Sequence, residues 1–135
     1  MSFDDLPDDW SDRPLTDPAL VADVLDLVVF ARDRQQGAVS FLLCDEDARL
    51  VQPVTITDIP ATAAIDDRRR CLRTVVGAMS GRGSLLVAVA RDDGLSICAS
   101  DEAWRDAAVA ECSDGVRLLG VHVVTHAGSR EVPAA

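Results

Sequence analysis

The sequence predicts an α/β fold, a three-layer α-β-α sandwich in which helices cover both faces of a mixed sheet. Residues 85–90 form an unbroken apolar run, which is typical of a strand buried on both faces. Apolar residues at helical spacing alternate with strand-like runs in the order α-β-β-α-β-α-β, followed by a short final strand. With 135 residues and a hydrophobic share of 48%, the chain can form one domain with a substantial core.

The chain begins with an acidic segment. Residues 1–16 are rich in Asp and interrupted by Pro, and we expect a loose tail whose aromatic side chains, including Trp10, dock on the domain. The alternative is an acidic-hydrophobic segment that a partner binds. We expect the domain itself to span residues 17–132, with a short tail at 133–135.

A first helix is expected immediately after this tail. Asp17 supplies a capping side chain, Pro18 suits the first helical position, and Gly37 ends the helix. Apolar residues cover more than half of the circumference of this helix. We therefore expect it to pack on the sheet and to keep apolar surface for a second contact.

Two strands and a second helix follow. Residues 38–44 and 50–57 have the composition of two strands joined by a short hairpin. Pro53 indicates that the second strand lies at an edge of the sheet or carries a bulge, because proline has no N–H group to donate to a neighbour. Residues 62–80 have the apolar periodicity of a helix.

This second helix carries the only basic cluster of an acidic chain. We expect its arginines to lie mostly away from the apolar stripe, on a solvated face: Arg68, Arg69, Arg70 and Arg73. The alternative is that the cluster contacts an anion or a partner, with Arg69, Arg70, Arg73 and Trp10 as the candidate interface.

The central segment joins a buried strand to a third helix. Turn residues at 91–94 end the strand, and Ser100 is expected to cap a helix whose first turn holds Asp101. Residues 116–125 predict another strand, and 130–132 a short final one. A loop at the carboxyl end of a central strand, beside a helix N-terminus, is where α/β proteins usually bind ligands. The candidate cleft residues there are Arg91, Asp92, Cys98, Ser100 and Asp101.

Composition excludes several classes of function. The formal net charge of -10 argues against a nucleic-acid groove, because acidic surfaces repel phosphates. The sequence contains neither Lys nor Tyr, so Schiff-base lysines, P-loop lysines and tyrosine acids are excluded. No apolar run approaches the roughly 20 residues that span a bilayer, and no secretory signal is visible. We expect a cytoplasmic protein that does not bind membranes.

Cysteine and histidine spacing gives no catalytic or metal motif. The four cysteines form no CxxC pair, and we expect small buried side chains; a Cys98–Cys112 disulfide is a disfavoured alternative. His122 lies in the middle of an expected strand and His126 in a turn, with no converging further ligands. A nucleophilic pair of Cys98 and His122 is also disfavoured. We therefore expect no bound metal and no cofactor.

The order of elements resembles the JAB/MPN domain, with the RadC-like branch the most similar. The resemblance rests on FLLCDEDARLVQPVTITDIP, a helix, SLLVAVARDDG, CASDEAW and LLGVHVV with a closing Gly turn, and it covers residues 37–132. It implies a cytidine-deaminase-like sandwich and, in active members, a zinc hydrolase site. Active members carry an upstream Glu, then His-x-His-Pro, then a Ser and an Asp.

The ligand pattern of that family is broken in this chain. Aligned without gaps, Asp101 and Cys98 fall on the Asp and Ser positions, while Ala88 and Ala90 fall on the two His positions. The upstream Glu falls near Gly37. Catalytic zinc needs about three protein ligands and an open position for water, which these residues do not supply.

The resemblance therefore implies a non-catalytic JAB/MPN-like domain that acts as an interaction or scaffold module, with a protein partner or a second copy of itself. The second hypothesis is a binder of a small anionic ligand, or an enzyme, that uses the cleft between Arg91 and Asp101. The third is a metallohydrolase with rearranged ligands, for instance Asp101, His122 and Cys98.

Overall fold

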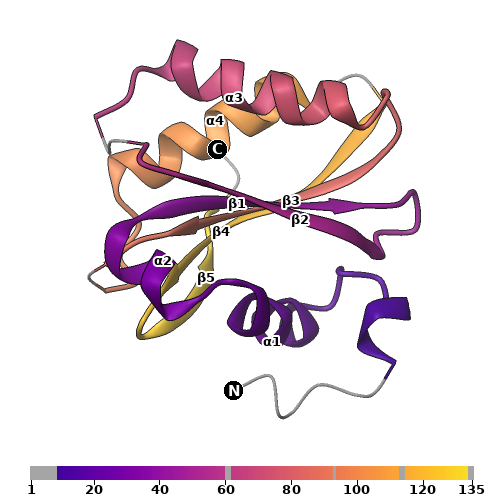
Figure 1. The fold of residues 1–135 in the computed structure, drawn as a ribbon, viewed down its shortest axis with the longest axis horizontal. Coiled ribbons are helices and arrows are strands. Elements are labelled where there is room, and N and C mark those ends of the chain that lie inside the picture. The colour runs from indigo at the N-terminus through magenta and orange to yellow at the C-terminus, as the bar shows by residue number, and fades with distance from the viewer. Residues whose placement is uncertain (1–8, 60–61, 93, 113–114, 134–135) are drawn as a thin grey trace.

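A five-stranded mixed sheet lies between two helical layers (Figure 1). The computed structural model describes residues 9–59, 62–92, 94–112 and 115–133. The strands are β1 (Ala38–Cys44), β2 (Leu50–Thr57), β3 (Gly83–Ala90), β4 (Val116–Thr125) and β5 (Gly128–Glu131). Their order in the sheet is β2-β1-β3-β4-β5. The β3–β4 pair is parallel and the other three pairs are antiparallel. The α/β class and the mixed sheet are confirmed.

The two helical layers divide the hydrophobic core into two halves. Helices α3 (Ile65–Ala78) and α4 (Ala99–Glu111) cover one face, and α1 (Pro18–Val28) covers the other (Figure 1). Phe41 and Val87 pack beneath α3 and α4, whereas Leu42 and Leu86 pack beneath α1. Strand β3 is buried on both faces along almost its whole length, as its unbroken apolar run predicts.

The expected first helix is two helices. α1 ends at Val28, and a short helix α2 (Ala31–Gln36) follows. Val29 and Phe30 adopt extended backbone conformations between them, which buries Val29 and leaves Phe30 63% exposed. The break lets Arg34 fold back and donate to the carbonyls of Leu25 and Asp26. The Asp26 carbonyl lies in the last turn of α1, where helix geometry leaves acceptors without intrahelical partners, and the Leu25 carbonyl also accepts from the backbone N–H of Val29.

Strand β2 is an edge strand, as Pro53 predicts, and its register with β1 shifts between Leu43 and Cys44. Because proline cannot donate, Pro53 fits the ladder only where backbone N–H groups point away from β1. Thr55 and Thr57, two and four residues further on, share that orientation. The Oγ atoms of Thr55 and Ser40 lie 2.9 Å apart across the ladder.

Several local predictions need correction. The N-cap of α4 is Cys98 rather than Ser100, because Asp101, three residues beyond Cys98, accepts a hydrogen bond from its backbone N–H in a capping box. Arg68 is 2% exposed and does not lie on a solvated face. All four cysteines are free. Cys98 and Cys112 bound the same 13-residue helix, roughly 20 Å apart, so they cannot form a disulfide.

Candidate functional site

The predicted cleft at the carboxyl end of β3 contains a buried ion pair. Arg91 follows the last residue of β3, and Asp101 lies in the first turn of α4. Arg91 Nε donates to Asp101 Oδ1 at 3.1 Å, and Arg91 Nη2 donates to Oδ2 at 3.0 Å. The Arg91 side chain is 20% exposed and that of Asp101 is 0% exposed. Such a two-pronged contact is the strongest geometry available to an arginine–carboxylate pair.

The same guanidinium also organises the loop that follows β3. Arg91 Nη1 donates to the carbonyls of Asp92 and Gly94, and Nη2 donates to the carbonyl of Ser96 at 2.7 Å. Arg91 therefore holds the loop against the start of α4. Its donors are committed to protein acceptors, which leaves little capacity to bind an anion.

Asp101 remains ionised in this environment. Burial alone would raise the pKa of its carboxyl group, but hydrogen bonds from Arg91 and from the backbone N–H of Cys98 outweigh burial. The pKa of Asp101 consequently lies below its ordinary value. The carboxylate acts as a cap and as the partner of Arg91.

A second buried arginine reaches the same helix end from α3. Arg68 Nη1 donates to Ser100 Oγ at 3.0 Å and to the Ser100 carbonyl, and Nε donates to the Ala63 carbonyl. The guanidinium carbon of Arg68 lies 5.1 Å from the centre of the Trp104 ring, a cation–π distance. Burial lowers the pKa of Arg68, and the nearby Cys98 and Asp101 oppose that effect.

The predicted cleft residues do come together. A cavity of about 280 Å³ is lined by Arg91, Asp92, Cys98 and Ser100, with Trp104 at its wall. Asp101 lies behind this lining. Both arginines at the cleft, Arg91 and Arg68, serve to hold loops and helix ends together, and this arrangement argues against an anion-binding role.

The rearranged metal site does not assemble. His122 lies opposite Ala88 in the β3–β4 ladder, and Ala88 belongs to the core beneath α1. Cys98 and Asp101 lie at the N-terminus of α4, on the other face of the sheet. Ala88 and Ala90, which align with the His positions of JAB/MPN domains, are both buried beneath α1. Among the described residues, no three His, Cys, Asp or Glu side chains are grouped so as to hold a metal ion.

The residues suggested as one interface lie on two faces. Trp10 packs against the core beneath α1, as expected for this side chain, and residues 1–8 of the expected tail lie outside the described residues. Arg69 and Arg73 lie on α3 in the opposite layer, and both donate to Glu111 of α4 at 2.9 Å and 3.2 Å. Arg70 is largely exposed and lies 3.7 Å from Asp67. Trp10 and the arginines therefore cannot contact a single flat partner surface.

Sequence reasoning missed a groove between β2 and α3. Its volume is about 430 Å³, and its floor is apolar, formed by Ile56, Ile59, Cys71 and Trp104. Charged side chains of Asp58, Asp67 and Arg70 form the rim. These residues come from the edge strand, the following loop and two helices, so no local pattern marks them as one site. The available signal was Pro53, which identifies β2 as an edge strand.

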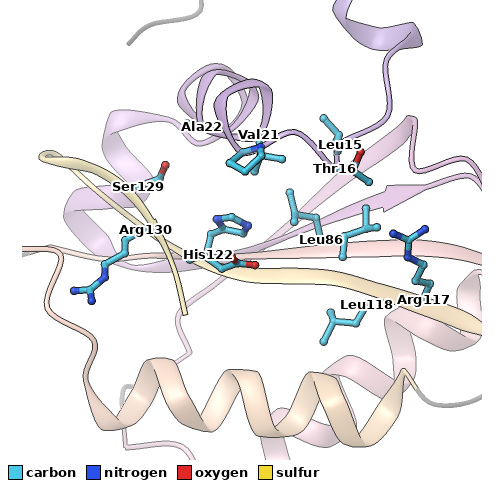
Figure 2. Close-up of a pocket in the computed structure, with 13 residues that line it drawn as sticks. Leu15, Thr16, Val21, Ala22, Leu86, Arg117, Leu118, His122, Ser129 and Arg130 are labelled. Atoms are coloured by element: carbon cyan, nitrogen blue, oxygen red, sulfur yellow. The ribbon is translucent and has the colours of Figure 1, made fainter. Parts of the chain in front are cut away.

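A further cavity of about 330 Å³ lies on the other face, between α1 and strands β4 and β5. Figure 2 shows His122 projecting from the sheet toward Val21 and Ala22 of α1. Glu131 pairs with His122 in the β4–β5 ladder and also lines the cavity. The sequence indicated only that His122 lies within a strand.

Comparisons with known proteins give no match: no family model, no curated protein and no solved structure is detectably similar to this chain. Across the described residues, no helix has the length and apolar character needed to cross a membrane.

Proposed function

We propose that this chain is a non-catalytic interaction domain that binds an extended segment of a partner protein as an additional strand beside β2. The observation that carries the proposal is the open edge of β2 beside the apolar groove. Residues 50–57 contain no charged side chain. Edge strands are ordinarily protected by charges or coverage, because their free N–H and C=O groups pair readily with another chain.

Backbone geometry supports strand addition. The N–H groups of Thr55 and Thr57 point away from β1, so an incoming strand finds donors at alternate residues. Pro53 supplies only a carbonyl, which limits pairing toward the start of the strand. Recognition by strand addition draws affinity from such main-chain bonds and specificity from pockets for alternate side chains.

The groove and its rim indicate the chemistry of the partner. Ile56 and Ile59 on one side, with Cys71 and Trp104 beneath, suit an aliphatic or aromatic side chain of the incoming strand. Asp58 is exposed at the rim, and the whole chain carries a net charge of -10. A partner segment with apolar residues at alternate positions and Arg or Lys at its flanks is therefore favoured.

This proposal retains the resemblance to JAB/MPN domains and their cytidine-deaminase-like fold. The order of strand, loop and helix N-terminus around Asp101 supports the resemblance. The engagement of Arg91 with Asp101 favours an interaction domain over an anion binder, and the separation of His122 from Asp101 disfavours the rearranged hydrolase.

A random-peptide display selection against the folded protein tests the proposal. We expect enrichment of peptides with alternating apolar residues and basic flanks. Thr74→Trp, which places a large ring in the groove from an exposed position on α3, should weaken their binding about tenfold or more. The matched control Val109→Trp, at an exposed position on α4, should leave binding unchanged.

Chemical modification of the peptide separates strand addition from simple hydrophobic contact. An enriched peptide can be N-methylated at either of its two sets of alternate residues. Only one set has N–H groups that point toward β2, so methylation of that set should abolish binding and methylation of the other should not. Equal binding to wild type and Thr74→Trp, or no dependence on methylation in either register, would refute the proposal. If the protein is a dimer in solution and Thr74→Trp dissociates it, the groove binds a second copy of this chain instead.

A further inference from the structure

The cavity beneath α1 presents two polar groups that face the same small space. An added Cβ at Gly120 would lie 2.9 Å from Glu131 Oε2 and 3.3 Å from His122 Nε2. The carboxylate and the imidazole therefore converge above a residue that has no side chain of its own. No ion pair joins Glu131 to His122 among the described residues, and both side chains line the cavity beneath α1, where a ligand can reach them.

A neutral His122 can supply a second acceptor beside the Glu131 carboxylate. Burial lowers the pKa of His122, and the carboxylate of Glu131 only partly opposes that effect. A neutral imidazole has one nitrogen that accepts and one that donates. With Nε2 as the acceptor, His122 and Glu131 offer a lone pair and a negative charge to one donor group.

The remaining lining combines apolar side chains with the polar side chains of Thr16, Arg117, Ser129 and Arg130. Figure 2 shows Leu15 and Leu86 between His122 and Arg117, with Val21 facing His122 and with Ser129 and Arg130 at the end of the cavity away from Arg117. Arg130 alternates with Glu131 along β5 and pairs with Val123, whose side chain belongs to the core beneath α4. Arg130 also lines the cavity, and its Nη1 donates to the Leu95 carbonyl, which engages part of its guanidinium outside the space next to His122.

We propose that this cavity binds small molecules that carry a primary ammonium group on a short aliphatic chain. The ammonium donates to Glu131 and His122 above Gly120, and the chain lies against Leu86 and Val21. Three N–H donors on a compact cation match two convergent acceptors, which a neutral hydroxyl satisfies only in part. The net charge of -10 adds a long-range attraction for cations. This site lies on the opposite face of the sheet from the β2 groove and is independent of the proposed function.

Titration of the full chain with hexylamine, monitored through the NMR signals of Gly120 and the His122 ring, tests this assignment. We expect saturable shifts at both residues, and binding of hexanol and hexanoate at least about tenfold weaker. Glu131→Gln should reduce hexylamine affinity about tenfold or more while the fold is retained, since residue 131 is exposed.

Two controls separate the cavity from general attraction of amines to an acidic protein. Glu46→Gln removes one exposed carboxylate from the β1–β2 hairpin and should leave affinity unchanged. Gly120→Ala places a methyl group 2.9 Å from Glu131 Oε2, which displaces the carboxylate, and should abolish the shift of the His122 ring. Equal affinity for hexylamine and hexanoate, or unaltered binding by Glu131→Gln, would overturn the proposal.

Discussion

Replacement of Asp101 by Asn is expected to lower the free energy of unfolding by about 3 kcal/mol, because it breaks a buried ion pair. The carboxylate accepts two hydrogen bonds from Arg91 and one from the backbone N–H of Cys98, and the Cys98 side chain adds a further one. Asn has one acceptor oxygen, so its amide nitrogen would face at least one of these donors. The estimate lies at the lower end for buried pairs because Arg91 stays 20% exposed and keeps three backbone carbonyls as acceptors.

Thermal and chemical denaturation measure this loss. For a chain of 135 residues, 3 kcal/mol corresponds to a decrease in Tm of about 10 °C. Asp106→Asn is the matched control, because Asp106 pairs with Arg105 on the same helix but is 56% exposed; we expect a loss below about 1 kcal/mol. If Asp101→Asn lowered the free energy of unfolding no more than the control, the position of Arg91 would not depend on Asp101. The Arg91 guanidinium would then be available to bind a ligand in the cleft.

Three further predictions follow from local geometry. Gly83→Ala should lower the free energy of unfolding by at least about 2 kcal/mol, because φ at Gly83 is +106° and the added Cβ would lie 2.6 Å from the Cys44 carbonyl oxygen. The control Gly77→Ala, within α3, should raise the free energy of unfolding by about 0.5–1 kcal/mol. Equal effects of the two substitutions in chemical denaturation would contradict this prediction. A thiol reagent at pH 8 should label exposed Cys98 at least about a hundredfold faster than Cys44, whose pKa burial raises to about 12; equal rates would show that Cys44 is accessible. Burial lowers the pKa of His122 in the folded protein below its value of about 6.5 in the unfolded chain. The contribution of His122 to the free energy of unfolding is therefore complete above about pH 6.5 and is lost as pH falls through the pKa of the folded state. His122→Gln should therefore lose less stability than wild type between pH 7 and pH 5, and an identical loss would place His122 in solvent.

The strands were predictable because their patterns are local. Residues 38–44 and 50–57 match β1 and β2, and Pro53 indicates an edge strand or a bulge from sequence alone. The strand at 116–125 was likewise predicted with its observed bounds. Alternation and turn residues encode these elements within a few positions of each other.

Tertiary contacts decided the features that were missed. The apolar periodicity of the first helix continues through Val29, so the break there depends on burial of Val29 and on Arg34 folding back. Arg68 is indistinguishable in sequence from its exposed neighbours, and only its contacts with Ser100 and Trp104 explain its burial. Neighbouring elements in space, rather than neighbours along the chain, determine both.

The two sites differ in how much the sequence revealed. The location of the cleft near Arg91 was predictable, because the strand, the loop and the helix that form it follow one another along the chain. Its structural role was not, since the bonds of Arg91 to Asp101 and Ser96 depend on loop conformation. The space between His122 and Glu131 depends on the β4–β5 register and on the absence of a side chain at Gly120.

Amide hydrogen exchange of β2 tests the central claim most directly, with a peptide enriched by selection as the added ligand. We predict that the outward N–H groups of Thr55 and Thr57 exchange rapidly in the free protein and become protected when the peptide binds. Protection confined to the loop after β3 or to the first turn of α4, with Thr55 and Thr57 unchanged, would contradict strand addition and return the binding function to the cleft.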